Sequence, residues 1–375
     1  MHVVLSSQSL AGAYSLPRAT LGQMAVRIAM QCSESDAALI LSDENTAARL
    51  ISRPGEAIYN DAGGLLEGNQ PFQVAWLSTA KHQEMLAAIT SRDRSQGSQL
   101  PPPVIFEGNR PCRWQPTLAD AAIASAGGSG ITGLLGESVE IGPPRTLLLT
   151  RNTGRNVLMI APGESRGAVL AATVSAFVKS NPKLQLIYLD GNRVDDAPTL
   201  APWFSESGIA CDVVRARDSE ATIVRLSQLV KERGDEAENV DPVVVIIDPL
   251  ERFRDFRQDE SFNFSLDAAA SGPNGAAALQ DLLRDGPSAN VFVMLVCGSA
   301  ETLSRWLPRA SQHDLELRIL GRMNATDSSA LIDTPLAADL SAATMLLYDD
   351  ADGRITKFRQ CDLPAADTVK AWLNS

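Results

Sequence analysis

The sequence predicts an α/β protein with a doubly wound, mostly parallel sheet and a C-terminal β-hairpin. Continuous apolar segments such as Val243–Ile247 and Val291–Val296 are typical of parallel strands that are buried on both faces. From Asn156 onward these segments alternate with helical segments, the order that produces a doubly wound sheet. The hairpin is predicted from Thr344–Tyr348 and Ile355–Arg359, which flank a turn of aspartates and glycine.

Length and composition fit a water-soluble chain of one large or two domains. The chain has 375 residues, of which 45% are hydrophobic and 21% charged. No apolar run reaches the roughly eighteen residues that a membrane span needs. The N-terminus also lacks the basic region and apolar core of a signal peptide. We therefore expect a cytoplasmic protein with no direct membrane insertion.

The spacing of the cysteines and histidines and the net charge argue against a metal site and a nucleic-acid-binding surface. The five cysteines are scattered without a C-x-x-C motif, and the three histidines are far apart, so we expect reduced thiols and no metal site. The formal net charge is −12, and the densest basic run, Glu251–Arg257, is interrupted by acids. The isolated chain is therefore expected to bind nucleic acid weakly, if at all.

Residues 1–78 contain too few predicted elements to close a core. Ala25–Met30 and Gln73–Leu77 are predicted to be strands, with a helical turn at Thr46–Ile51 between them. A polar segment that ends in prolines, Ser91–Pro103, follows them and is typical of a linker. Further on, Val104–Arg113 and Gly136–Gly142 are predicted to be strands, and the glycine-rich Ala122–Ile131 a flexible loop.

The two ends of the chain share a pattern of residues. The spacing from Arg27 to Asp36 equals that from Arg318 to Asp327. Matching landmarks follow in the same order, namely Ala47–Leu50 and Ala337–Leu340, Tyr59 and Tyr348, and Gly63–Gly64 and Asp352–Gly353. The pattern indicates an internal repeat, and chance similarity of short apolar segments is the alternative. Residues 1–78 are then the tail of a domain whose nucleotide-binding half lies upstream.

The segment Asn156–Leu170 stands where a nucleotide-binding domain places its phosphate loop. A predicted strand, Val157–Ile160, precedes it, and a predicted helix, Gly167–Phe177, follows. A working loop has the motif G-x-x-x-x-G-K-[ST], in which backbone amides and Lys hold the phosphates and Ser/Thr holds Mg²⁺. Here Ala161 replaces the first Gly, Arg166 the second Gly, Gly167 the Lys and Ala168 the Ser/Thr. The segment keeps the architecture of an ATPase and lacks the groups that perform the chemistry.

These features together resemble the FtsK/SpoIIIE branch of the RecA-like, HerA-related motor ATPases. The resemblance rests on the loop at Ala161–Ala168, a second nucleotide motif at Val243–Asp248, the segment Leu282–Leu295 and the repeated closing pattern. It implies tandem ATPase domains similar to those of type VII secretion ATPases, whose later copies are often degenerate. On this basis residues 1–78 are the tail of an upstream ATPase domain, 79–103 a linker and 104–375 a degenerate ATPase domain.

The departures from the family pattern concern catalytic positions. Pro249 replaces the acidic residue after Asp248, and Glu251 comes two positions later. The sensor region has Val296–Ser299 where the family has Gln. The Arg that the family carries after Asp-Ser is Ser329 in one copy and Ala38 in the other.

The degenerate nucleotide site is expected to comprise residues of the loop and of the second motif, namely Ala161, Gly163, Glu164, Ser165, Arg166, Gly167, Ala168, Asp248 and Glu251. Asp248 is interpreted either as a Mg²⁺ ligand or as a strand-terminal carboxylate that bonds a loop. Arg166 either reaches a phosphate or fills the phosphate site by pairing with Asp248 or Glu164. Gly163 and the helix N-terminus still permit weak anion binding.

Two further groups of residues carry alternatives. Arg27 and Arg318 either act in trans as arginine fingers or form ion pairs between subunits. Alternatively, they pair within the fold with Asp36 and Asp327. The segment that contains Phe253 and Phe256 is a candidate pore or partner loop, with its apolar side chains exposed.

The first hypothesis for function is a non-hydrolysing C-terminal module of an FtsK/SpoIIIE-like translocase of DNA or protein, which serves assembly, regulation or partner docking. The alternatives are an active ATP-binding DNA translocase and a substrate-recognition module of a secretion ATPase. No cofactor is required, although weak binding of ATP and Mg²⁺ is allowed, and no metal site or catalytic residue is expected. The expected partners are upstream ATPase domains of the same protein, further copies in the full-length form and a protein substrate or partner. DNA is expected to bind only through the whole assembly.

Overall fold

The structure is a computed structural model that divides into two compact units, residues 1–103 (unit 1) and 104–375 (unit 2). It describes residues 4–9, 18–95, 111–161, 163–192, 200–234, 240–257 and 274–375. Within these ranges, no helix is long and apolar enough to cross a membrane.

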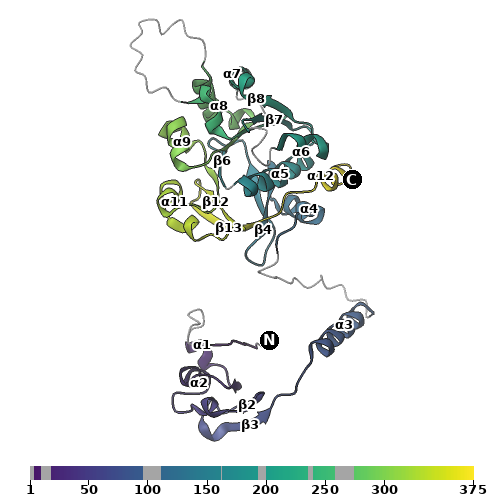
Figure 1. Cartoon of the computed structure of the whole chain (residues 1–375), viewed down its shortest axis with the longest axis vertical. Coiled ribbons are helices and arrows are strands. Elements are labelled where there is room, and N and C mark those ends of the chain that lie inside the picture. Colours follow the sequence, from purple (N-terminus) through teal and green to yellow (C-terminus); the bar gives the residue numbers. More distant parts are fainter. Residues whose placement is uncertain are drawn as a thin grey trace. The chain divides into compact units, whose positions relative to one another are not determined.

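Unit 2 is built on a 10-stranded sheet with strand order β5-β4-β13-β12-β11-β6-β10-β9-β7-β8 (Figure 1). The strands from β11 to β8 in this order are parallel, and the pairs from β5 to β11 are antiparallel. Their bounds are β4 Ile131–Ser138, β5 Arg145–Leu149, β6 Val157–Ile160, β7 Gln185–Asp190, β8 Asp212–Arg215, β9 Val243–Asp248, β10 Val291–Val296, β11 Leu317–Leu320, β12 Thr344–Asp349 and β13 Arg354–Gln360. The predicted doubly wound sheet and its C-terminal hairpin, β12–β13, are confirmed.

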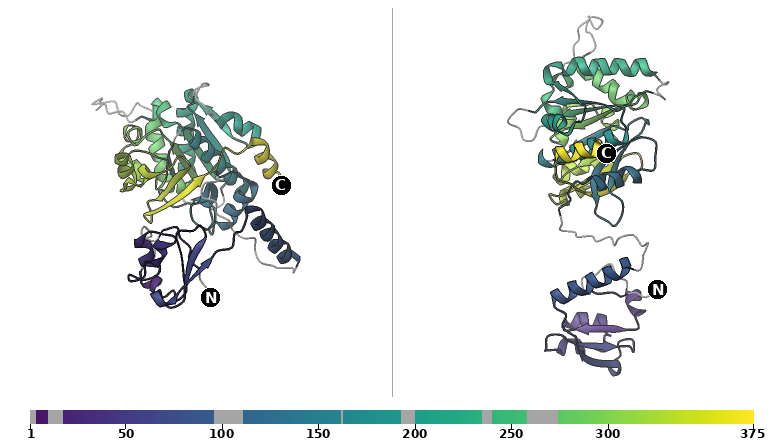
Figure 2. Two further views of the ribbon diagram at one scale, coloured as in Figure 1. Left: turned by 60° about the horizontal axis from the view of Figure 1, so that its bottom comes forward. Right: turned by 90° about the vertical axis from the view of Figure 1, so that its right-hand side faces the viewer.

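Helices cover both faces of this sheet (Figure 2). On one face lie α4 Pro116–Ser125, α5 Gly163–Ser180, α6 Leu200–Ser207 and α12 Ala366–Leu373. On the other lie α7 Ala216–Arg233, α8 Gly275–Asp285, α9 Ala300–Trp306 and α11 Ala325–Ile332, with the short helices η4 Leu250–Arg252, η5 Arg254–Phe256 and η7 Pro335–Asp339. The helices α10 Arg309–His313 and η6 Pro287–Ala289 complete the unit.

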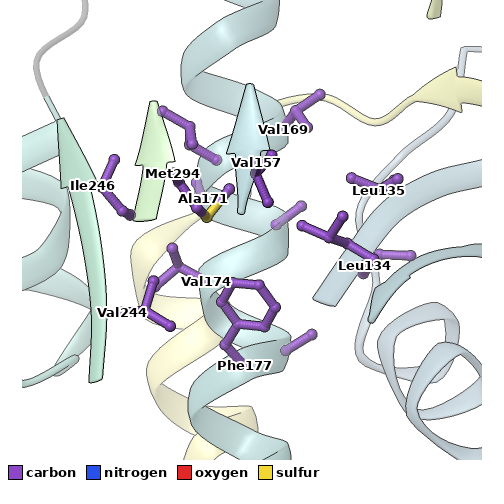
Figure 3. Close-up of a cluster of buried hydrophobic side chains, with 14 of the residues drawn as sticks. Leu134, Leu135, Val157, Val169, Ala171, Val174, Phe177, Val244, Ile246 and Met294 are labelled. Atoms are coloured by element: carbon purple, nitrogen blue, oxygen red, sulfur yellow. The ribbon is translucent and has the colours of Figure 1, made fainter. Parts of the chain in front are cut away.

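The helix α5 lies at the centre of one face. Its apolar side chains Val169, Val174 and Phe177 pack against side chains of β6, β10 and β9, including Val157 and Met294 (Figure 3). These strands are buried along their whole length. Alternate side chains of each strand enter the two core clusters, so the middle of the sheet is closed on both faces.

Unit 1 has a three-stranded antiparallel sheet, β1 Arg27–Met30, β2 Glu56–Asn60 and β3 Asn69–Gln73. The capped helix α2 Glu34–Ile40 and the turn η1 Ala47–Leu50 pack with one face of it. The remaining helices are α1 Arg18–Gly22, η2 Leu66–Gly68 and α3 Thr79–Ser95. Helix α3 overlaps residues 79–103, the segment that was expected to be a linker. The mostly polar residues after Ser78 form this helix, and their described side chains are exposed.

The internal repeat is visible as one order of elements in both units. A strand, a capped helix, a short 3₁₀ helix and an antiparallel hairpin follow each other as β1-α2-η1-β2-β3 and as β11-α11-η7-β12-β13. Side chains at matching places fill both small cores, with Ala29, Leu41, Ala48, Ile51 and Ile58 in unit 1 and Leu320, Ile332, Ala337, Leu340 and Leu346 in unit 2. Two landmarks were wrong. Arg27 pairs with Asn60 and Arg318 with Tyr348, so Tyr59 does not match Tyr348. Ala48 and Ile51 take the places of Ala337 and Leu340 in the cores, so Ala47–Leu50 matches Ala337–Leu340 only after a shift of one residue.

Two further expectations are corrected. The predicted flexible loop Ala122–Ile131 is too long, because only residues 126–130 lie outside helix and strand and its ends belong to α4 and β4. The cysteines are not all reduced, since Cys112 and Cys361 form a disulfide where the chain after Pro111 runs beside the end of β13. Most of the predicted strand Val104–Arg113 lies outside the described residues.

Candidate functional site

The residues at the position of the phosphate loop form the first turn of a helix. The strand β6 ends at Ile160 and α5 begins at Gly163, so only residues 161 and 162 separate them. The predicted helix start at Gly167 was wrong by one turn, and Gly163 to Ala168 are all helical. A phosphate-binding loop needs an extended stretch whose amides curve around the anion. The described residues between β6 and α5 contain no such stretch, and a carboxylate, Glu164, stands in the first turn.

Asp248 ends the central strand β9 and is deeply buried. Tyr188, on the neighbouring strand β7, donates its hydroxyl to Asp248 Oδ2 at 2.7 Å. Asn192, just after β7, donates to the Tyr188 hydroxyl at 3.2 Å and to the Asp248 carbonyl at 3.3 Å. These contacts connect the carboxyl ends of two adjacent parallel strands, the place where α/β sheets bind ligands.

Arg166 connects this cluster to α5. Its Nε lies 3.3 Å from Asp248 Oδ1, and its terminal nitrogen donates to Asn192 Oδ1 at 3.1 Å. The Asp248 side chain is 3% exposed and that of Arg166 17%, so the ion pair is largely screened from water. Of the alternatives for Arg166, the structure shows the pair with Asp248.

The charge of Asp248 depends on this pair. Burial raises the pKa of the Asp248 carboxyl above its usual range, and Arg166 opposes the shift. Burial and the neighbouring Asp248 raise the pKa of Tyr188, so its phenol stays protonated and acts as the donor. The guanidinium of Arg166 supplies positive charge beside this buried carboxyl group.

The ion-pair network extends along the sheet to β8. Asp190, the last residue of β7, accepts the backbone amide of Asn192 at 3.0 Å through Oδ1. Its Oδ2 accepts Arg215 at 2.6 Å. The two strand-terminal aspartates, Asp190 and Asp248, therefore each have an arginine partner, although the buried Asp248 Oδ1 accepts no hydrogen bond among the described residues.

Glu251 occupies a different place from a carboxylate directly after Asp248. The short helix η4 turns the chain back, so a methyl group placed on Gly298 would lie 3.0 Å from Glu251 Oε1. Among the described residues, the buried Glu251 Oε2 has no hydrogen-bond partner. Glu251 thus lies beside the end of β10, at the sensor position, and not directly after Asp248.

A cavity of about 990 Å³ opens at the N-terminus of α5. Gly163, Glu164, Ser165 and Ala168 line one side of it, and the ends of β11, β12 and β13 line the other. Gln360 donates to the Ser165 hydroxyl at 2.7 Å across this space. Two carboxylates, Glu164 and Asp362, and one guanidinium, Arg322, line this cavity, so its charged lining is net negative and disfavours a phosphate there.

The residues proposed to fit a Mg²⁺–nucleotide complex do not fit it. The loop lacks its curved amides, position 167 lacks an ammonium group, and Asp248 is bonded to Arg166 and Tyr188. In the described part of the chain, no group of three His, Cys, Asp or Glu side chains could hold a metal ion.

Phe253 and Phe256 were expected in an exposed loop and are instead buried. Their exposed fractions are 1% and 0%, and their rings stack with centroids 5.4 Å apart beneath α8. Two short 3₁₀ helices turn both rings into the core and leave Arg252 and Arg254 at the surface. This segment is therefore not an apolar partner loop.

Arg27 and Arg318 have equivalent contacts, but these are not the predicted Arg–Asp pairs. Each Nε donates to a carbonyl three residues earlier, Met24 at 3.0 Å and Leu315 at 3.1 Å. Each also donates to the end of the following helix, at the Leu41 and Leu331 carbonyls.

The aspartates have a different role. Asp36 and Asp327 instead bond the N-cap residues Ser33 and Asn324 of α2 and α11. Arg318 additionally pairs with Asp350 at 2.9 Å. The recurring arginine therefore ties a strand to a helix terminus within each copy.

Sequence reasoning missed Tyr188, Asn192 and Asp190. The signal was present, because polar residues directly after the buried strand Gln185–Asp190 are expected at the carboxyl edge of a parallel sheet. Their partnership with Asp248 depends on β7 and β9 being neighbours, which the order of strands along the chain does not specify.

No protein-family model matches the sequence, and no curated protein matches it. Solved structures do resemble the fold. The conjugation coupling protein TcpA of pCW3, in its monomer form with ATPγS, is 11% identical, with 85% of this chain and 90% of that chain covered and a TM-score of 0.50. The cytoplasmic domain of the type VII secretion ATPase EccC of Thermomonospora curvata is 14% identical, with 95% of this chain and 44% of that chain covered and a TM-score of 0.54.

At these identities the similarity shows the fold, which is the RecA-like P-loop ATPase fold of FtsK/SpoIIIE-type proteins. The chain spans less than half of the EccC cytoplasmic domain.

Proposed function

We propose that unit 2 is a non-hydrolysing module of an FtsK/SpoIIIE-like ATP-driven translocase, with a role in assembly, regulation or partner docking. The observation that supports this proposal is the ion pair between Arg166 and Asp248. The arginine belongs to the helix that should begin after the phosphates, and it is bonded to the carboxylate that should hold Mg²⁺.

Catalysis of phosphoryl transfer depends on cations that neutralise charge developing on the phosphate oxygens. Gly167 and Ala168 supply neither the ammonium group nor the hydroxyl metal ligand, and Arg166 is already bonded to two partners. The proposal therefore places ATP hydrolysis in other ATPase domains of the same assembly, and unit 1 in the C-terminal part of such a domain.

The test is a phosphate-release assay on the purified full chain with ATP and Mg²⁺. We expect no turnover above a buffer blank and no change on Asp248→Ala. Turnover that disappears in Asp248→Ala refutes the proposal and favours an active ATPase. Calorimetric titration with ATP provides a second readout, in which a micromolar dissociation constant would show that the first-turn amides and Arg166 suffice for binding.

A further inference from the structure

One face of the sheet of unit 1 exposes apolar side chains along β1, while Ala57 on the same face is fully buried. In the pairing of its strands, Met30 lies opposite Ala57, which lies opposite Phe72, so these side chains point to one side. Ile28 shares that side, and α2 packs with the other. The exposed fractions are 56% for Ile28, 50% for Met30 and 54% for Val26, which directly precedes β1.

The internal repeat shows how the same face is covered in unit 2. With Arg27 matched to Arg318, Val26 corresponds to Leu317 and Ile28 to Ile319. These two residues are 2% and 0% exposed. Both belong to the buried cluster to which α5 contributes Val169, Leu170, Val174 and Phe177. The difference in exposure is therefore due to a missing layer, since the strand, its capped helix and its hairpin are present in both copies.

The edge of the sheet differs in the same way. In unit 2 the strand β11 lies between β12 and β6, and it pairs with β6 in parallel from Leu317↔Val157 to Leu320↔Ile160. In unit 1, β1 pairs with β2 and is the terminal strand of its sheet in the described residues. An unpaired edge beside an exposed apolar face is a template for a further strand.

We infer that β1 and this face bind a strand–helix segment from another RecA-like nucleotide-binding core. The strand would pair in parallel with β1, as β6 does with β11, and the helix after it would cover Val26, Ile28 and Met30, as α5 covers Leu317 and Ile319. Unit 2 itself has no such segment to give, because its β6 is enclosed between β11 and β10. The inference does not depend on whether unit 2 hydrolyses ATP.

The test adds a donor segment to the full chain. Residues 156–181, which include β6 and α5, are joined to the N-terminus through a flexible Gly/Ser linker. Hydrogen exchange of the backbone amides of Arg27–Met30 is compared with that of the unmodified chain. We expect exchange to slow by at least about tenfold, which corresponds to about 1.4 kcal/mol.

Two variants of the extended chain identify the contact. Ile28→Asp should abolish the protection without unfolding unit 1, because this side chain is already exposed. Ile141→Asp, at an exposed apolar residue of unit 2 (79% against 56% for Ile28), is the control and should retain the protection.

Amides that exchange equally fast with and without the added segment overturn the inference, as does protection that survives Ile28→Asp. Protection that appears in the unmodified chain with increasing concentration would show that a second copy covers the face, and also overturns it.

Discussion

Replacing Arg166 by methionine is expected to destabilise unit 2 by about 3 kcal/mol at pH 7. Removing one member of a buried ion pair typically costs about 3–5 kcal/mol, because the remaining charge keeps its burial and loses its partner. The Asp248 side chain is 3% exposed, so water cannot replace the guanidinium. The hydrogen bond from Tyr188 remains in the variant, which places the expected loss at the lower end of this range.

The loss should depend on pH in a defined direction. Burial already raises the folded-state pKa of Asp248, and removal of Arg166 raises it further. A carboxyl with a raised folded pKa binds its proton more tightly in the folded than in the unfolded chain. Stability therefore falls as pH rises from the ordinary carboxyl pKa of about 4 through the folded value. The deficit of Arg166→Met should be largest at neutral pH and shrink towards pH 4, to about 1 kcal/mol for the lost hydrogen bond to Asn192.

Urea unfolding followed by tryptophan fluorescence measures this effect. Four tryptophans report on unit 2, namely Trp114, Trp203, Trp306 and Trp372. In a double-mutant cycle, Asp248→Asn combined with Arg166→Met should recover about 2 kcal/mol of coupling. Arg305→Met is the matched control, because its pair with Glu301 is exposed and should cost about 0.5 kcal/mol.

The proposed charge balance at Asp248 would be contradicted if Arg166→Met lowered the free energy of unfolding equally at pH 4 and pH 7. Additive effects of the two substitutions in the double-mutant cycle would also contradict it.

Three other predictions follow from the same geometry. Gly167→Lys combined with Ala168→Thr should not create ATP turnover in a phosphate-release assay, because both positions lie inside α5 rather than after a phosphate loop. Measurable turnover would contradict the conclusion that this part of α5 cannot act as a phosphate loop. Duplex DNA should bind weakly and lose affinity steeply with salt in fluorescence anisotropy, because the net charge is −12; tight binding at physiological salt would restore the DNA translocase hypothesis. Arg318→Ala should lower the stability of unit 2 by about 2–3 kcal/mol in urea unfolding, because two carbonyls and Asp350 lose their donor, and wild-type stability would contradict this role.

The parallel part of the sheet could be predicted because burial on both faces produces a recognisable local sequence pattern. Val243–Ile247 and Val291–Val296 are apolar at every position, and no other element of this length requires that. The strand Ile131–Ser138 carries two glycines and a threonine, and the sequence predicts only its end, from Gly136, as a strand. Its glycines are dictated by neighbours distant in sequence, since a methyl group on Gly133 would lie 2.5 Å from Thr173 of α5.

Contacts in the candidate site were predictable where a sequence motif fixes the positions of both residues. They were not predictable where the two partners come from separate strands. A pair between Arg166 and Asp248 was one of the expected alternatives, because the phosphate loop and the second motif face each other in this fold. The contact of Tyr188 with Asp248 requires the order of strands, and the burial of Phe253 and Phe256 requires α8 above them. The disulfide joins cysteines 249 positions apart, a separation at which sequence spacing has no predictive value.

The Arg166–Asp248 pair also bears on how an inactive copy keeps its fold. In an active site of this type, the carboxylate at the end of the central strand is balanced by a metal ion that comes with the nucleotide, and the lysine of the phosphate loop balances the phosphates. Here the balancing cation is covalently part of α5, so the charge of Asp248 is compensated without any ligand. Losing the loop residues alone would have left a buried, uncompensated carboxylate next to Tyr188. Under the proposed function, the arginine is therefore the change that makes the loss of nucleotide tolerable, and the pH dependence of Arg166→Met measures its contribution directly.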